Sequence, residues 1–179
     1  MLTMIFISVL VPLYRRAPVN WDQVGDQICS VARTMSILGD RWTMLVVREA
    51  FAGTTLFDEF VAYTGATPQV ISERLKRLVE AGIFETRAKD KGRGSEYVMT
   101  EMGRDLHPII STIIVFGDKW LSDGKGPPQV TRHVGCGCVT APRLACSECS
   151  EFVSPANLTR EPSPAMQRYR ARMLTAASK

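Results

Sequence analysis

Polar and basic side chains gather along one short stretch of this 179-residue chain, in a pattern that suits contact with nucleic acid. The stretch is a predicted helix over residues 68–81, on which successive residues are about 100° apart. Polar residues that could reach base edges occupy the N-terminal part of its outer face: Gln69, Ser72 and Glu73. Basic residues that could reach phosphates lie on the flank and the outer face: Arg74, Lys76 and Arg77.

The elements around this helix complete a recognisable motif. A short helix over 55–63 and a turn at 64–67 come before it, and Thr67-Pro68 provides a cap and a first helical residue. Two strands, 83–89 and 96–100, follow it as a β-hairpin or "wing". Three basic residues of the wing could lie along the DNA backbone or in the minor groove: Lys89, Lys91 and Arg93. The pattern predicts a winged helix-turn-helix, although a solvated helix face beside an ordinary hairpin would carry similar charges.

Further helices are predicted over 29–38 and 41–51, and a long one runs from the Thr100 cap to about Leu121 with a kink at Pro108. Apolar residues surround this long helix nearly completely, beyond the stripe that one core needs. We therefore expect a homodimer whose interface includes Ile109, Ile113, Phe116 and Trp120. The alternative is that the chain's own domain covers the whole helix.

Four of the five cysteines lie between residues 136 and 149. His133 and Cys136 have the same x₂ spacing as Cys146 and Cys149, and such paired ligands are typical of zinc knuckles and ribbons. The expected ligands are these four residues, with Cys138 left free and zinc as the cofactor that soft thiolates favour. A labile redox pair, or unpaired thiols in a loose tail, are the alternatives.

The fifth cysteine, Cys29, is predicted at a helix N-terminus, where a thiolate is stabilised. It is a candidate sensor of oxidants or electrophiles. Asp26 nearby opposes that role, and most free cysteines are simply small buried apolar residues.

Composition is that of an ordinary globular protein, with 45% apolar residues, 22% charged residues and a net charge of +4. We find no paired carboxylates at a useful spacing and no phosphate loop. Outside the cysteine cluster, neither histidine has a nucleophile for which it could act as a base, so an enzyme is not expected. The apolar run at 1–13 is too short to span a membrane. It suits a partner-packing helix or a start codon placed too far upstream better than an anchor or signal. We expect a cytoplasmic protein that does not enter the membrane.

The expected organisation is an N-terminal extension (1–26), a winged helix-turn-helix domain (27–122), a Cys-rich appendage (123–153) and a polar tail (154–179). The fold class is thus mainly α with a small β-hairpin, an α+β winged helix with a C-terminal appendage.

Several motifs in this domain also occur, in the same order, in the HxlR-type winged helix-turn-helix regulators, which the chain resembles over residues 27–121. They are Cys29, the turn Gly39-Asp40-Arg41-Trp42, Phe57 and Phe60, the run Pro68 to Leu75, and the run Tyr97 to Gly103. The resemblance implies a homodimeric transcriptional regulator that binds a palindromic operator in double-stranded DNA. The wing has less proline than is common in that family. The alternative function is a winged-helix protein–protein interaction module with a metal-stabilised Cys-rich tail.

Overall fold

The computed structural model describes residues 21–89 and 94–177. The predictions for Lys91, Arg93 and the apolar run 1–13 lie outside these residues. The described chain divides into two compact units. One runs from Ile37 to Arg160, and the other combines the segment up to Ser36 with the segment from Glu161 onward.

The second of these units contains a 3₁₀ helix (Trp21–Asp26), most of helix α1 (Ser30–Leu38) and helix α7 (Pro164–Ala177). The 3₁₀ helix and α1 approach closely, because a Cβ placed on Gly25 would lie 2.9 Å from the hydroxyl oxygen of Ser36. The helix predicted over 29–38 is confirmed by α1, and the polar tail contains α7.

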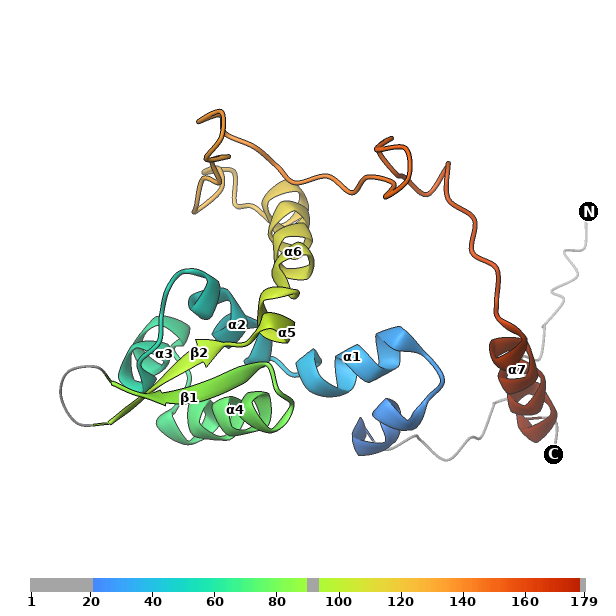
Figure 1. Ribbon diagram of the computed structural model, residues 1–179, viewed down its shortest axis with the longest axis horizontal. Helices are drawn as coiled ribbons and strands as arrows, with labels where there is room; N and C mark the ends of the chain where they lie inside the picture. The colour runs from blue at the N-terminus through green and yellow to red at the C-terminus, as the bar shows by residue number, and fades with distance from the viewer. Residues whose placement is uncertain (1–20, 90–93, 178–179) are drawn as a thin grey trace, which may run out of the picture. The chain divides into compact units, whose positions relative to one another are not determined.

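The unit from Ile37 to Arg160 is built around α2 (Thr43–Phe51), α3 (Phe57–Thr64) and α4 (Pro68–Glu80), with the hairpin strands β1 (Phe84–Ala88) and β2 (Ser95–Met99) beside them (Figure 1). Helices α2, α3 and α4, strand β1 and the residue before β1 contribute side chains that are almost completely buried. They are Val46, Val47, Phe60, Ile71, Leu75, Leu78, Ile83 and Phe84. The predicted fold class, a winged helix-turn-helix, is confirmed.

The hairpin is antiparallel, with Phe84 opposite Met99 and Ala88 opposite Ser95. The N–H of Tyr97 donates to the carbonyl oxygen of Thr55 at 2.8 Å, so the segment that leads into α3 is tied to β2. The Phe60 ring lies 6.3 Å from the ring of Phe84 and 6.4 Å from that of Tyr97. Aromatic packing thus holds the hairpin against α3.

The long helix predicted from Thr100 to Leu121 is two helices, α5 (Glu101–Arg104) and α6 (His107–Trp120). Thr100 does act as a cap, since its hydroxyl accepts from the N–H of Gly103 at 3.1 Å. The prediction of one kinked helix was wrong because Pro108 lies in the first turn of α6. A missing N–H costs nothing there, so the proline begins a new helix.

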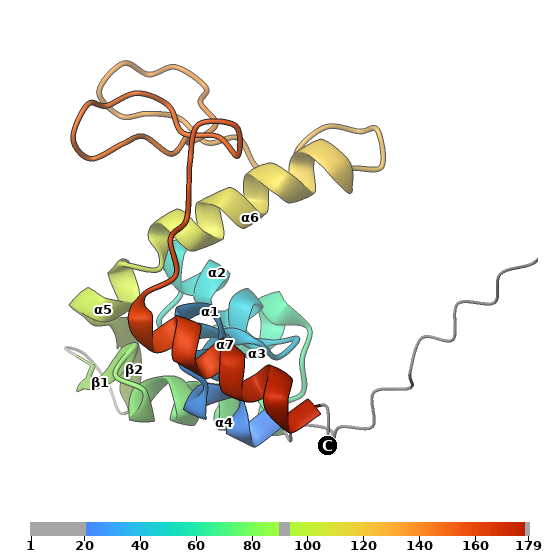
Figure 2. The same ribbon diagram turned by 90° about the vertical axis from the view of Figure 1, so that its right-hand side faces the viewer.

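Beyond α6, the chain from 121 to 163 forms no helix and presents almost every side chain to solvent. Figure 2 shows α6 continuing from α5, followed by successive loops.

Gly103 in α5 and Gly117 in α6 provide a test of how closely α5 packs against Ile83. A Cβ on Gly103 would lie 2.3 Å from the carbonyl oxygen of Ile83, whereas one on Gly117 would meet nothing within 4 Å. We expect Gly103→Ala to lower the free energy of unfolding by about 1–3 kcal/mol. Gly117→Ala, inside α6, should raise it by about 0.5–1 kcal/mol. Denaturant unfolding of both variants measures the difference, and equal effects would contradict the packing of α5 on the start of β1.

Candidate nucleic-acid interface

The helix-turn-helix is formed by α3, the turn at 65–67 and α4. Gly65 ends α3 with a left-handed φ of 73°, a conformation that glycine adopts without strain. The hydroxyl of Thr67 then accepts from the N–H of Val70 at 3.4 Å, and Pro68 occupies the first turn of α4. Ala66 is buried beneath the turn. Both helix ends in the motif are therefore fixed by local residues.

Helix α4 has two distinct faces. Ile71, Leu75 and Leu78 are buried with at most 1% of their surface exposed. The residues predicted to contact DNA, Arg74 excepted, are exposed on the other side: Gln69, Ser72, Glu73, Lys76 and Arg77. The structure thus places these five together on one outward face.

Two ion pairs lie along this outer face, and in each of them the two partners are one helical turn apart. Lys76 Nζ is 3.8 Å from Glu80 Oε1, and Arg77 Nη2 is 3.6 Å from Glu73 Oε1. Exposed pairs of this length contribute at most about 1 kcal/mol. Both cations can therefore exchange their carboxylate partners for phosphates at small cost.

Arg74 differs from the sequence prediction that it reaches phosphates. Only 16% of its side chain is exposed, and its Nε lies 3.0 Å from Oδ1 of Asp40 while its Nη1 lies 3.2 Å from Glu73. Asp40 precedes α2, where its carboxylate accepts from the N–H of Trp42 at 2.8 Å and that of Thr43 at 3.1 Å. Arg74 therefore links α4 to the start of α2, a role that the helical period alone does not reveal.

The surroundings of Asp40 favour its charged form. Partial burial raises the pKa of Asp40, but the hydroxyl of Thr43, the N–H groups of Trp42 and Thr43, and the charge of Arg74 together lower it below the usual value. The carboxylate is therefore ionised whenever the folded protein is near neutral pH.

On the wing, Lys89 is half-buried at the end of β1. Arg87 on the same strand is exposed, and its Nε donates to Glu85 at 2.8 Å. Arg87 is therefore a further basic residue of the wing that could contact DNA. Its position on the first strand, two residues before Lys89, can be read from the sequence.

Cys29 lies just before α1, where its carbonyl oxygen accepts from the N–H of Arg33 at 3.0 Å. Its side chain is half-buried. The predicted position at a helix N-terminus is confirmed, and the sensor role stays a prediction.

In the Cys-rich appendage, His133 Nδ1 lies 3.4 Å from the sulfur of Cys136. The pKa of Cys146 is lowered, chiefly because the N–H of Cys149 and then that of Glu148 donate toward its sulfur. The two predicted pairs remain apart, since no three potential metal ligands converge within the part of the chain that the structure describes.

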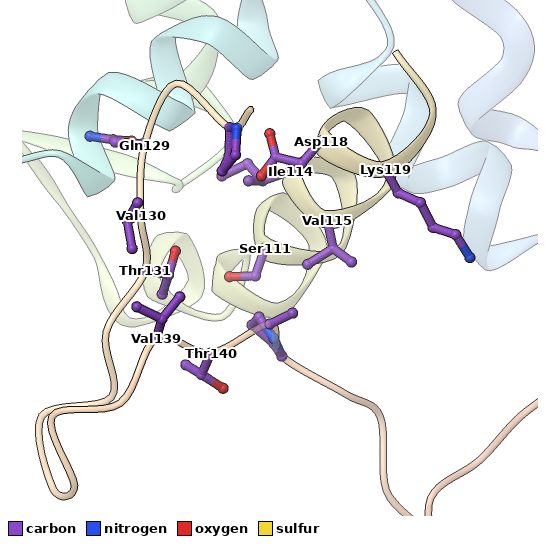
Figure 3. A pocket seen from close by; sticks show the side chains of 13 residues that line it. Ser111, Ile114, Val115, Asp118, Lys119, Gln129, Val130, Thr131, Val139 and Thr140 are labelled. Atoms are coloured by element: carbon purple, nitrogen blue, oxygen red, sulfur yellow. The ribbon is translucent and has the colours of Figure 1, made fainter. Parts of the chain in front are cut away.

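The appendage also lines a cavity of about 470 Å³ beside α6 (Figure 3). Ser111, Ile114 and Asp118 form the helix side of this cavity, and Val130 and Val139 belong to the appendage. The cavity lies on one face of α6, and Ile113, Phe116 and Trp120 of the same helix are exposed.

A helix-turn-helix with a buried inner face, a polar and basic outer face and an adjoining hairpin defines the class of this protein: it is a winged helix-turn-helix protein. Residues 37–125 match the family model described as HxlR-like helix-turn-helix. The chain belongs to that family, whose domain binds DNA.

Known proteins support the assignment. The uncharacterized HTH-type transcriptional regulators Rv3095 of Mycobacterium tuberculosis and Mb3122 of Mycobacterium bovis are each 40% identical over 137 residues, covering 75% of this chain and 86% of each relative. The solved structure of PA1607, a candidate transcription factor, is 25% identical, with a TM-score of 0.70 over 79% of this chain and 99% of that one. These relatives are named as regulators rather than enzymes. Within the described residues, no helix is long and apolar enough to cross a membrane.

The ion pair between Asp40 and Arg74 predicts a specific pH dependence. A lowered folded-state pKa stabilises the fold above the unfolded-state value of about 3.9, and this contribution is lost as the pH falls through the folded-state pKa. At neutral pH, Asp40→Asn should cost about 1–3 kcal/mol, because Arg74 loses its charged partner while the cap remains.

Urea unfolding of the parent and the variant from pH 7 to pH 3 measures this difference, which should shrink toward zero below pH 4. Asp123→Asn, which removes an exposed carboxylate paired with Lys125, is the control and should change stability only slightly at any pH, because solvent screens such an exposed pair. A constant difference between the parent and Asp40→Asn would contradict the assigned role.

Proposed function

We propose that this protein regulates transcription by binding a palindromic operator as a homodimer, with α4 in the major groove and the wing along the DNA backbone. The observation that carries the proposal is the two-faced character of α4. Its inner face is buried by the domain, and its outer face presents Gln69, Ser72, Glu73, Lys76 and Arg77 to solvent. Such a helix can contact bases and phosphates without disturbing the core.

A second copy of the chain is proposed for two reasons. One recognition helix contacts too few base pairs for a useful specificity ratio, so two half-sites are needed. In addition, α6 exposes a row of large apolar side chains: Ile113 at 48%, Phe116 at 58% and Trp120 at 65%. The helical period puts this row opposite the face that lines the cavity. An apolar row of this kind suits burial against its symmetry mate.

The alternative is a winged-helix module that contacts another protein through the same outer face of α4. Free basic groups favour DNA, because Lys76 and Arg77 are 76% and 60% exposed and hold only weak ion pairs. A regulator of this kind would act in the cytoplasm, where bacterial DNA is accessible.

The basic residues of α4 should contribute affinity that does not depend on sequence. Lys76→Ala or Arg77→Ala should weaken binding to all DNA sequences. Each substitution should lower the slope of log K against log salt by about one unit per lost phosphate contact, hence about two per dimer. Lys125→Ala, an equally exposed lysine outside α4, is the control and should keep the parental slope. An unchanged slope in the Lys76/Arg77 double variant would contradict the docking of α4.

The polar residues at the start of α4 should instead set sequence preference. Gln69→Ala should change which bases are selected from a randomised operator, with about 1–3 kcal/mol of discrimination lost for each bidentate contact removed. Selection and sequencing of bound oligonucleotides measures this directly. A parental motif recovered by both Gln69→Ala and Ser72→Ala would show that these residues do not contact bases.

If the exposed apolar row on α6 forms the dimer interface, a charge introduced into this row should prevent dimerisation. Trp120→Asp or Ile113→Asp should yield folded monomers with strongly reduced operator affinity, because an unpaired carboxylate would be desolvated in the interface. Val134→Asp, at a 99% exposed position in the appendage, is the matched control and should remain dimeric. Sedimentation equilibrium tests all three, and a monomeric parent that still binds a palindrome tightly would exclude the proposed interface.

A further inference from the structure

Residues 131–140 form a compact turn, here called the first knuckle. The N–H of His133 donates to the carbonyl oxygen of Cys138 at 3.0 Å, and the N–H of Gly137 donates back to that of His133 at 2.8 Å. At its base, Arg132 and Val139 form an antiparallel bridge. This turn holds His133 and Cys136 on one loop.

Residues 144–153 form a second knuckle on the same plan, displaced by thirteen residues. The N–H of Cys146 donates to the carbonyl oxygen of Glu151 at 2.9 Å, and the N–H of Ser150 donates back to that of Cys146 at 2.9 Å. Its base is a bridge between Ala145 and Phe152. Each bond and bridge has its counterpart in the first knuckle, so Cys146 corresponds to His133 and Cys149 to Cys136.

Backbone conformation repeats as well. Gly137 has a φ of 69°, and Ser150, the corresponding residue, has a φ of 59°. Ser150 is the one residue other than glycine with positive φ among those that the structure describes. A serine adopts this conformation at some cost, so the second knuckle keeps the turn even where its sequence does not favour it.

Each knuckle brings its two soft ligands together. The 3.4 Å between His133 Nδ1 and Cys136 Sγ is close to the edge of a tetrahedron with Zn–N about 2.0 Å and Zn–S about 2.3 Å, which is about 3.5 Å. Gly135 makes room for this approach, because a Cβ there would lie 3.0 Å from the His133 ring. In the second knuckle the matching backbone hydrogen bonds put Cys146 and Cys149 at the positions that His133 and Cys136 hold in the first.

We propose that the two knuckles are the halves of one structural zinc site, with His133, Cys136, Cys146 and Cys149 as its four ligands. The halves are separate in this structure, where Figure 1 shows the two loops at different places along the orange segment. The nine residues 137–145 between Cys136 and Cys146 allow one ion to join the loops. Two ligands from each knuckle complete the tetrahedral set that structural zinc requires.

The repeat also excludes Cys138 from the ligand set. Cys138 corresponds to Glu151, and its thiol donates to the carbonyl oxygen of Cys136 at 3.7 Å rather than facing His133. The knuckles have no core of their own, since all of their residues except Cys146 and Val153 are exposed. Coordination would therefore supply the folding energy of this segment. The inference does not depend on DNA binding.

Elemental analysis of the full chain, purified under reducing conditions, should find about one zinc per chain. Cobalt substitution should give the absorption of a tetrahedral ion with three thiolates. Cys146→Ser should lose the metal, whereas Cys138→Ser, the matched control, should keep it. His133→Cys should also keep it and strengthen the thiolate charge-transfer band. Far-ultraviolet circular dichroism reports whether the winged helix survives in each variant.

Absence of zinc from the reduced parent, or loss of zinc in Cys138→Ser, would overturn the assignment. One zinc per two chains would also overturn it, because the ion would then be shared between molecules. If Cys146→Ser aggregates, cobalt titration of chelator-stripped parent and Cys138→Ser decides the question instead. Equal stoichiometry of one ion per chain in both would support the site, and a difference between them would refute it.

Discussion

Burial of one face of α4 is the constraint on which the rest of the DNA-binding unit depends. Ile71, Leu75 and Leu78 lose nearly all of their exposed surface, and each such burial contributes about 1.5–3 kcal/mol. The exposed ion pairs on the opposite face contribute at most about 1 kcal/mol each. The inner face therefore determines how the helix is oriented, and the outer residues are free to be selected for what they contact.

Other contacts refine this orientation. The turn at Gly65 and the Thr67 cap fix where α4 begins, and the rings of Phe60, Phe84 and Tyr97 hold the wing against α3. The ion pair between Arg74 and Asp40 connects α4 to α2. The recognition helix and the strands of the wing are consequently parts of one packed body, so that the backbone at Arg77 on α4 keeps a fixed position relative to the backbone at Arg87 on β1.

Local signals made much of this fold predictable. Thr67-Pro68 and Gly82 mark the ends of α4 because caps and left-handed turns depend on neighbouring residues. The break between α5 and α6 was not predicted, because the apolar pattern resumes at Leu106 and the close approach of Gly103 to Ile83, which helps to hold α5 in place, is a tertiary contact. The partner of Arg74 was also hidden, since Asp40 is distant in sequence. The two knuckles are alike in their backbone hydrogen bonds, although the residues that form these bonds differ in type. The sequence alone therefore shows only the equal spacing of the two ligand pairs.

Hydroxyl-radical footprinting of the purified protein on fragments selected from its own genome would test the central claim most directly. The account predicts two related half-sites about one helical turn apart, with the strongest backbone protection flanking two adjacent major grooves. A single protected half-site, or fragments selected without any common sequence, would contradict the claim that this protein binds a palindrome through two copies of α4.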